Sequence, residues 1–219
     1  MDLKTKKEFI EFLIESNVLI FGEFLTKSKR KTPYFINTGN FKTAKQINIL
    51  GHFYAKMVFE SKVEYDALFG PAYKGISLVL SCCNALYTDY DINKPFLFNR
   101  KEEKDHGEGG NFIGYIPKEN EKIIIVEDVL TAGTAVKEVL PILKSCFNVH
   151  CNNLFVLVDR CEIASSSSNK ASLELKQKFN IDVNSLVNIK DILEFLKTNE
   201  KFNKHKKSMQ EYIEKFCIL

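Results

Sequence analysis

One segment near the middle of the chain limits the fold more than any other. Residues 123–126 read Ile-Ile-Ile-Val, and they are followed by Glu127, Asp128 and a turn of small residues that runs to Ala135. A continuous apolar run of this kind is typical of a strand in a parallel sheet that is covered on both faces. Small side chains let backbone N–H groups approach an anion, and the start of the next helix adds a favourable dipole. The segment predicts a phosphate-binding unit, although a plain strand–helix turn with a threonine N-cap would fit the same pattern.

Strand and helix patterns alternate along the rest of the chain. Strands are expected at residues 21–25, 34–36, 67–69, 95–98, 154–158 and 186–189. Helices are expected at residues 6–19, 43–59, 75–86, 171–179, 191–196 and 209–216, and one more ends near residue 143. Such alternation favours a doubly wound parallel α/β sheet, in which ligands bind beyond the carboxyl ends of the strands. The length of 219 residues suits one such domain with a small appendage.

Composition and charge exclude several classes of function. The net charge of +3 is too small to favour nucleic acid as a partner, and the lysine-rich residues 197–207 are best interpreted as a solvated helix. No apolar run is long enough to cross a membrane, and the N-terminus does not resemble a signal peptide. The six cysteines form no CxxC pair, so neither a zinc site nor a redox motif is expected. We expect a cytoplasmic protein with no nucleic-acid or membrane partner.

Four further segments carry side chains that suit an anionic substrate. Residues 69–75 place a tyrosine and a lysine at a sharp strand–helix turn, and residues 99–110 form a charged loop that could close over a polyanion. Residues 21–37 pair a basic turn with an aromatic strand, and Arg160 follows a strand, where it could hold a carboxylate with two hydrogen bonds. Taken singly, each segment also fits a purely structural role, such as a solvated loop or an internal ion pair.

Together these segments resemble the orotate phosphoribosyltransferases of the type I phosphoribosyltransferase family. The resemblance is strong from about residue 21 to residue 160. Its most specific part is the loop Arg-Lys-x-x-Lys-Asp-His-Gly-Glu-Gly-Gly at residues 100–110, and residues 123–135 resemble the signature that binds phosphoribosyl pyrophosphate (PRPP). It implies a type I phosphoribosyltransferase-like α/β fold, with a parallel sheet flanked by helices, in a single domain of residues 1–219. A small N-terminal hood would be formed mainly by residues 1–40, and a PRPP-binding core by about residues 41–200.

The resemblance also implies an activity and its partners. The reaction would transfer the 5-phosphoribosyl group of PRPP to N1 of orotate, giving orotidine 5′-monophosphate and pyrophosphate in pyrimidine (UMP) biosynthesis. Mg²⁺ is the expected cofactor, held by PRPP and at most through water by Glu127 and Asp128, without a direct protein ligand. A homodimer that shares its catalytic loops is implied, and association with a separate orotidine 5′-monophosphate decarboxylase is left open.

Roles pass to individual residues by the same resemblance. The expected catalytic residues are Lys101, Lys104, His106 and Asp128, with the largest contribution from Lys104. The residues expected to bind PRPP are Lys27, Tyr73, Lys74, Arg100, Lys101, Lys104, His106, Glu127, Asp128, Val129, Leu130, Thr131, Ala132, Gly133, Thr134 and Ala135. The residues expected to bind orotate are Phe35, Ile36, Thr131 and Arg160.

Three positions depart from the family pattern. Lys29 stands where glycine is usual, Ile36 stands where phenylalanine is frequent, and Glu127 replaces the first of two aspartates. Glutamate at that position also occurs in purine-type relatives, but those usually carry an aspartate at the position of Thr131. Two alternatives remain open: a purine or uracil phosphoribosyltransferase, and a PRPP-binding regulator without catalysis. The intact loop of residues 100–110 counts against the regulator.

Overall fold

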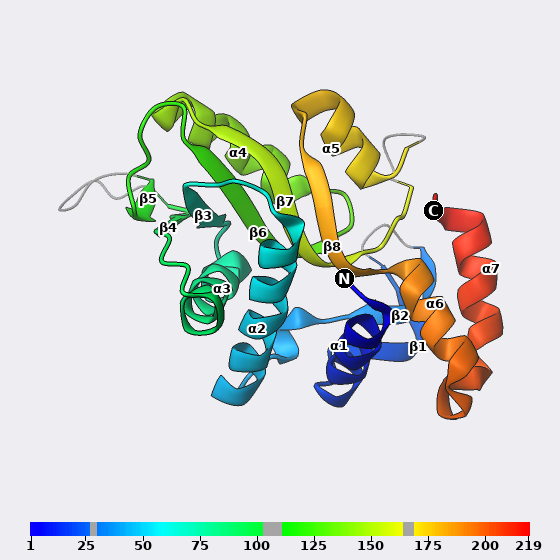
Figure 1. Cartoon of the computed structure of the whole chain (residues 1–219). Helices are drawn as coiled ribbons and strands as arrows, with labels where there is room; N and C mark the ends of the chain where they lie inside the picture. Colours follow the sequence, from blue (N-terminus) through cyan, green and yellow to red (C-terminus); the bar gives the residue numbers. More distant parts are fainter. Residues whose placement is uncertain (27–29, 103–110, 164–168) are drawn as a thin grey trace.

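The computed structural model describes residues 1–26, 30–102, 111–163 and 169–219. Its centre is a six-stranded sheet in the order β5-β4-β3-β6-β7-β8 (Figure 1). The strands are β3 (Ala67–Gly70), β4 (Phe96–Asn99), β5 (Phe112–Gly114), β6 (Lys122–Leu130), β7 (His150–Asp159) and β8 (Asp182–Asn188). All pair in parallel except β5, which runs antiparallel to β4. The predicted parallel α/β architecture is confirmed.

Helices cover both faces of this sheet (Figure 1). They are α1 (Leu3–Glu15), α2 (Ala44–Ser61), α3 (Lys74–Tyr90), α4 (Thr134–Phe147), α5 (Ala171–Phe179), α6 (Ile189–Thr198) and α7 (Lys206–Phe216), with short 3₁₀ turns η1 (Thr38–Asn40) and η2 (Glu200–His205). Within β6, Ile124 and Val126 pack into one apolar cluster with α2 and α3, whereas Ile123 and Ile125 pack into a second cluster with α4 and α5. A strand buried on both faces requires such a continuous apolar run, which is the pattern seen in the sequence.

A second, smaller unit of structure is formed by the antiparallel hairpin of β1 (Leu19–Leu25) and β2 (Lys31–Ile36). The C-terminal helix α7 packs against β2, and α6 lies between α7 and α1 (Figure 1). The buried apolar side chains of α1, α6 and α7 belong to the same apolar cluster as those of α2 and α3. The division into a hood and a core at about residue 40 stays a prediction. None of the described helices combines the length and the apolar character that a membrane span requires.

Several boundaries differ from those expected. The first helix ends at Glu15 and Leu19 begins a strand, because Asn17 takes a left-handed conformation with φ of 53° that stops the helix. Strand β6 continues to Leu130 instead of ending at residue 126, because β7 pairs alongside it that far. The acidic pair therefore lies inside the last part of the strand. The short strand β5 was not predicted.

Candidate active site

Three neighbouring strands deliver charged side chains to one edge of the sheet. Lys74 follows β3, Asp128 lies near the end of β6, and Arg160 follows β7. Because β6 lies between β3 and β7, the parallel order brings these three groups to the same carboxyl edge. The backbone N–H of Arg160 donates to the carbonyl of Leu130 at 3.2 Å, which joins the ends of β6 and β7. This is the edge at which parallel α/β sheets bind ligands.

Asp128 is the centre of the polar contacts at this edge. Lys74 Nζ donates to Asp128 Oδ2 at 2.8 Å, the Thr38 hydroxyl donates to the same oxygen, and the Val129 N–H donates to Oδ1 at 2.7 Å. Asp128 is buried, whereas 59% of the Lys74 side chain is exposed, so the ion pair joins a buried carboxylate to a lysine at the surface. Thr38 was not predicted as a site residue, since no local pattern marks a threonine that lies 90 positions from its partner.

The pKa values of the two adjacent carboxyl groups are shifted in opposite directions. Burial, assisted by the negative charge of Asp128, raises the pKa of Glu127 to about 8. Burial alone would raise the pKa of Asp128, but hydrogen bonds from Lys74 and Thr38 outweigh it and lower that pKa. Near neutral pH the edge therefore holds a charged Asp128 beside a largely protonated Glu127. One carboxylate accepts hydrogen bonds, and its neighbour can also donate one.

The turn after β6 has the form of an anion site. Residues 127–136 and Leu154 line a pocket of about 260 Å³. The N-cap of α4 is Gly133, with φ of 69°, and no side chain caps the helix. The alternative of a threonine N-cap is therefore wrong, and no side chain among the described residues caps the first N–H groups of α4, which suits an anionic ligand. Thr131, Thr134 and Ala135 are exposed, whereas the Leu130 side chain is in the core, so Leu130 could contact PRPP only through its backbone.

The turn after β3 is held by contacts from the neighbouring strand. The N–H of Ala72 donates to Asn99 Oδ1 at 2.8 Å, which ties this turn to the end of β4. Tyr73 is 67% exposed, and Lys101 Nζ lies 5.7 Å from the centre of its ring. Arg100 Nε is buried and hydrogen-bonds to no described residue. Tyr73, Lys74, Arg100 and Lys101 thus lie on adjoining segments. The predicted residues Lys27, Lys104 and His106, and the departure at Lys29, lie outside the described residues.

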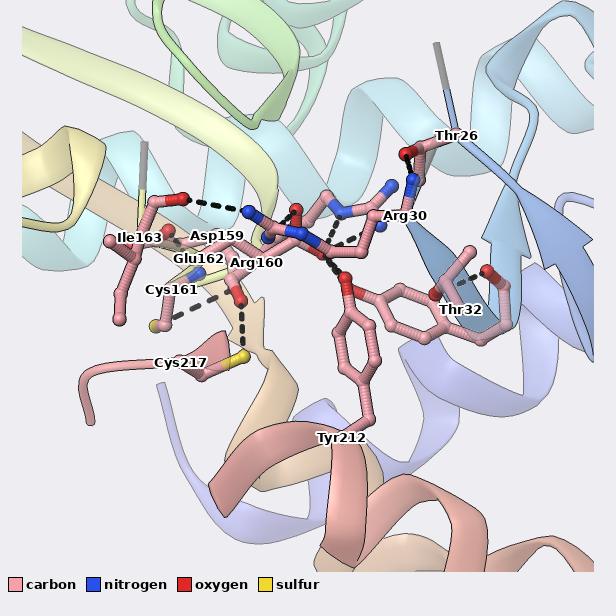
Figure 2. A network of polar contacts seen from close by, with 11 residues as sticks. Thr26, Arg30, Thr32, Asp159, Arg160, Cys161, Glu162, Ile163, Tyr212 and Cys217 are labelled. Carbon is pink, nitrogen blue, oxygen red and sulfur yellow. Dashed lines mark hydrogen bonds and ion pairs between the residues drawn. The ribbon is translucent and has the colours of Figure 1, made fainter. Parts of the chain in front are cut away.

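The residues expected to bind orotate are less simply arranged. Arg160 is buried, and its Nε and Nη2 donate to Glu162 Oε1 at 2.9 and 2.6 Å (Figure 2). The structural ion pair that was the alternative for this arginine is therefore present. Phe35 and Ile36 are neighbours on β2, where successive side chains point to opposite faces. Phe35 is 43% exposed and Ile36 packs against the core, so both side chains cannot face one ligand.

The sequence of this chain is similar to those of known proteins. Residues 37–187 match the family model of the phosphoribosyl transferase domain. The chain is 50% identical over 192 residues to an orotate phosphoribosyltransferase of Clostridium acetobutylicum, covering 87% of this chain and 85% of the relative. The chain belongs to the orotate phosphoribosyltransferase family. The resemblance seen in the sequence is thereby confirmed.

One solved structure agrees with this membership, and a second, more distant one shares the fold. The orotate phosphoribosyltransferase of Francisella tularensis superposes with a TM-score of 0.86 at 38% identity, covering 96% of this chain and all of that one. The UMP synthase of Leishmania donovani has a TM-score of 0.76 at 20% identity, which shows a shared fold. This chain matches 42% of that longer protein.

The raised pKa of Glu127 predicts a loss of stability as the pH rises. Between about 4.5, its ordinary value, and about 8, the folded state keeps a proton that the unfolded chain has released. The free energy of unfolding should therefore fall across this window, by a few kcal/mol at most. Glu127→Gln, which is neutral at every pH, should remove that part of the slope. Urea denaturation of both proteins at several pH values in the window measures the difference, and identical slopes would contradict the assignment.

Proposed function

We propose that this chain transfers the 5-phosphoribosyl group of PRPP to N1 of orotate, giving orotidine 5′-monophosphate and pyrophosphate in the synthesis of UMP. The observation that carries the proposal is the union, at one sheet edge, of the uncapped start of α4 with the Lys74–Asp128 pair. The first suits a phosphate, and the second suits a sugar and a pyrophosphate. The relatives named above contribute the choice of acceptor.

The proposal assigns each part of PRPP to a group of residues. The turn of residues 129–135 would hold the 5-phosphate through its backbone N–H groups and the hydroxyls of Thr131 and Thr134. Asp128 and Glu127 would accept hydrogen bonds from the ribose hydroxyls, and Lys74 would contact the pyrophosphate. Tyr73, Arg100 and Lys101 would surround the same pyrophosphate. Lys104 and His106, outside the described residues, are assigned to the departing pyrophosphate, and Lys27, also outside them, is assigned to PRPP.

Catalysis in this arrangement rests on position and charge. Orotate N1 is a competent nucleophile without a strong protein base, so the site has to align it with the anomeric carbon and stabilise the negative charge that develops on pyrophosphate. Lys74 is exposed and already oriented by Asp128, so its ammonium can meet that charge without a large rearrangement. Asp128 in turn would face the positive charge that develops on the ribose.

Mg²⁺ is proposed as the cofactor of the family reaction. Both oxygens of Asp128 already accept hydrogen bonds, and Glu127 is largely protonated near neutral pH. Within the described residues, no group of three or more His, Cys, Asp or Glu side chains could hold a metal. The acidic pair therefore fits Mg²⁺ held mainly by substrate oxygens, with Glu127 and Asp128 in contact through water. Bound there, the ion would neutralise charge on the pyrophosphate.

Orotate is assigned to Arg160, Thr131 and the end of β2. Its carboxylate suits a guanidinium that offers two parallel N–H donors. Either the exposed Phe35 or the backbone near Ile36 would then lie beside the pyrimidine ring. A homodimer with shared catalytic loops, a location in the cytoplasm and association with a decarboxylase partner stay predictions.

A direct assay tests the activity. Purified protein is mixed with PRPP and Mg²⁺ and, in parallel, with orotate, uracil or hypoxanthine, and pyrophosphate release is followed. We expect turnover with orotate alone. Turnover with uracil or hypoxanthine would favour the purine or uracil alternative, and binding of PRPP without turnover of any base would favour a regulator.

A further inference from the structure

The buried partner of Arg160 has contacts beyond one ion pair. Glu162 is 5% exposed, and its Oε1 accepts four hydrogen bonds: from Arg160 Nε and Nη2, from the Tyr212 hydroxyl at 2.7 Å and from the Tyr34 hydroxyl at 3.1 Å (Figure 2). Arg30 Nη1 lies 3.7 Å from Oε2. These donors come from β2, from α7 and from the segments beside them. Glu162 therefore joins the hairpin, the C-terminal helix and the end of β7.

The contacts leave one edge of the Arg160 guanidinium open. A guanidinium carries five N–H donors in a plane, and Nε together with one N–H of Nη2 forms its side edge. That side edge is bound to Glu162, and Tyr34 packs against the guanidinium with its ring centre 4.7 Å from Cζ. Within the described part of the chain, no hydrogen bond reaches Nη1. The end of the fork, Nη1 with the second N–H of Nη2, is thus free for a second carboxylate.

The charges of the cluster favour such a ligand. Arg30 and Arg160 bring two positive charges, and Glu162 supplies one negative charge. Two guanidinium groups thus share the Glu162 carboxylate, and an anion at the end of the Arg160 fork would pair with a guanidinium, whereas a neutral pyrimidine would not. The C-terminal segment also pairs with the backbone beside Glu162, since the Ile163 N–H donates to the Phe216 carbonyl and the Ile218 N–H donates to the Cys161 carbonyl, both at 2.9 Å.

We infer that Glu162, held by Tyr212 of the C-terminal helix, is a positioning residue for the acceptor: it binds the side edge of Arg160 so that the end of the fork is presented to the carboxylate of orotate. The inference rests on the proposed function. It makes α7 part of the machinery that selects the acceptor, although α7 does not itself touch the substrate. A guanidinium that is already held on one edge loses less conformational entropy when it binds a ligand. Correct positioning of Arg160 should therefore lower the KM for orotate.

The test removes the Tyr212 hydroxyl and measures KM for each substrate. Tyr212→Phe removes a single hydrogen bond to Glu162 with little change of shape, and it should raise KM for orotate about fivefold while KM for PRPP stays unchanged. Glu162→Gln should raise KM for orotate about tenfold or more. Tyr115→Phe is the matched control, because the Tyr115 hydroxyl donates to Glu121 at 2.9 Å far from this edge, and it should leave both KM values unchanged.

A double variant distinguishes positioning of Arg160 from a general contribution to the stability of the fold. Arg160→Lys keeps the charge but loses the planar fork, so it should itself raise KM for orotate. In that background Tyr212→Phe should add little, because the two changes act through the same contact. Additive effects, or an equal rise of KM for PRPP and orotate, would show that Tyr212 and Glu162 stabilise the fold without aiming Arg160.

The outcomes distinguish this inference from the proposed function. If the unmodified protein does not convert orotate, the proposed function fails. If it does, and Arg160→Lys leaves KM for orotate unchanged, the assignment of Arg160 fails and the inference falls with it. If Arg160→Lys has its effect and neither Tyr212→Phe nor Glu162→Gln does, the inference alone is overturned. Thermal melting of each variant shows whether Glu162→Gln folds, and Tyr212→Phe supplies the test if it does not.

Discussion

Asp128→Asn is expected to lower kcat/KM for PRPP by about a hundredfold while the protein stays folded. Asparagine keeps the size of the side chain, but it removes the charge and turns one oxygen into an amide donor. That donor would face either the Lys74 ammonium at the Oδ2 position or, after a flip of the amide, the Val129 N–H at the Oδ1 position, and both of these groups can only donate. Lys74 would lose its orientation, and the ribose would lose a charged acceptor. Steady-state kinetics with PRPP varied at saturating orotate measures the loss.

Stability should change much less than activity. The Lys74 side chain is 59% exposed, so its ammonium is hydrated when the partner is lost, and the free energy of unfolding should fall by only about 1–2 kcal/mol. The matched control is Asp182→Asn, which breaks an ion pair of similar length, 2.7 Å, between Asp182 and Lys176 at an exposed site on α5 and β8. That control should leave kcat/KM unchanged. Near-normal turnover of Asp128→Asn would show that Asp128 neither orients Lys74 nor contacts the ribose.

The part of the site that could be predicted is the part that is local in sequence. Residues 123–135 contain the buried strand, the acidic pair and the small-residue turn in one continuous stretch, so residue pattern and size indicated a strand and a turn that suits a phosphate, and the family resemblance favoured this site over a plain strand–helix turn. The turn of residues 69–75 could be recognised for the same reason. Parallel pairing then brings these segments to one site, because the carboxyl ends of neighbouring strands meet at the same edge of the sheet whatever the lengths of the connections.

What the sequence could not show are contacts between distant segments. Glu162 accepts hydrogen bonds from the hydroxyls of Tyr34 and Tyr212, which are 128 and 50 positions away in the sequence. Thr38 donates a hydrogen bond to Asp128, which is 90 positions away. None of these residues stands out locally. The opposite pKa shifts of Glu127 and Asp128 also depend on burial and on Lys74. They could not be derived from the presence of two adjacent acidic residues in the sequence. Strand β5 escaped prediction because three residues are too few for a period of two to be visible.

Gly75→Ala is expected to lower the free energy of unfolding by about 3 kcal/mol. A Cβ at this position would lie 2.7 Å from the Gly70 carbonyl carbon and 2.8 Å from Pro71 Cδ, and a Cβ at Gly70 would in turn meet the Gly75 carbonyl oxygen at 2.2 Å. The two glycines thus face one another where β3 turns into α3. Backbone and a proline ring cannot rotate away, so the turn itself must open. Urea denaturation, followed by a signal that reports the whole fold, gives the change.

The same substitution should also affect the site, because Lys74 lies next to Gly75. Opening of the turn would move the start of α3 away from β6, and the 2.8 Å contact between Lys74 and Asp128 could not persist unchanged. KM for PRPP should therefore rise together with the loss of stability. Gly22→Ala on β1 is the control: its Cβ would meet only the Phe24 ring, at 3.3 Å, and a flexible side chain can yield. If Gly75→Ala were as stable as Gly22→Ala, the close approach of β3 and α3 would be wrong, and with it the position assigned to Lys74.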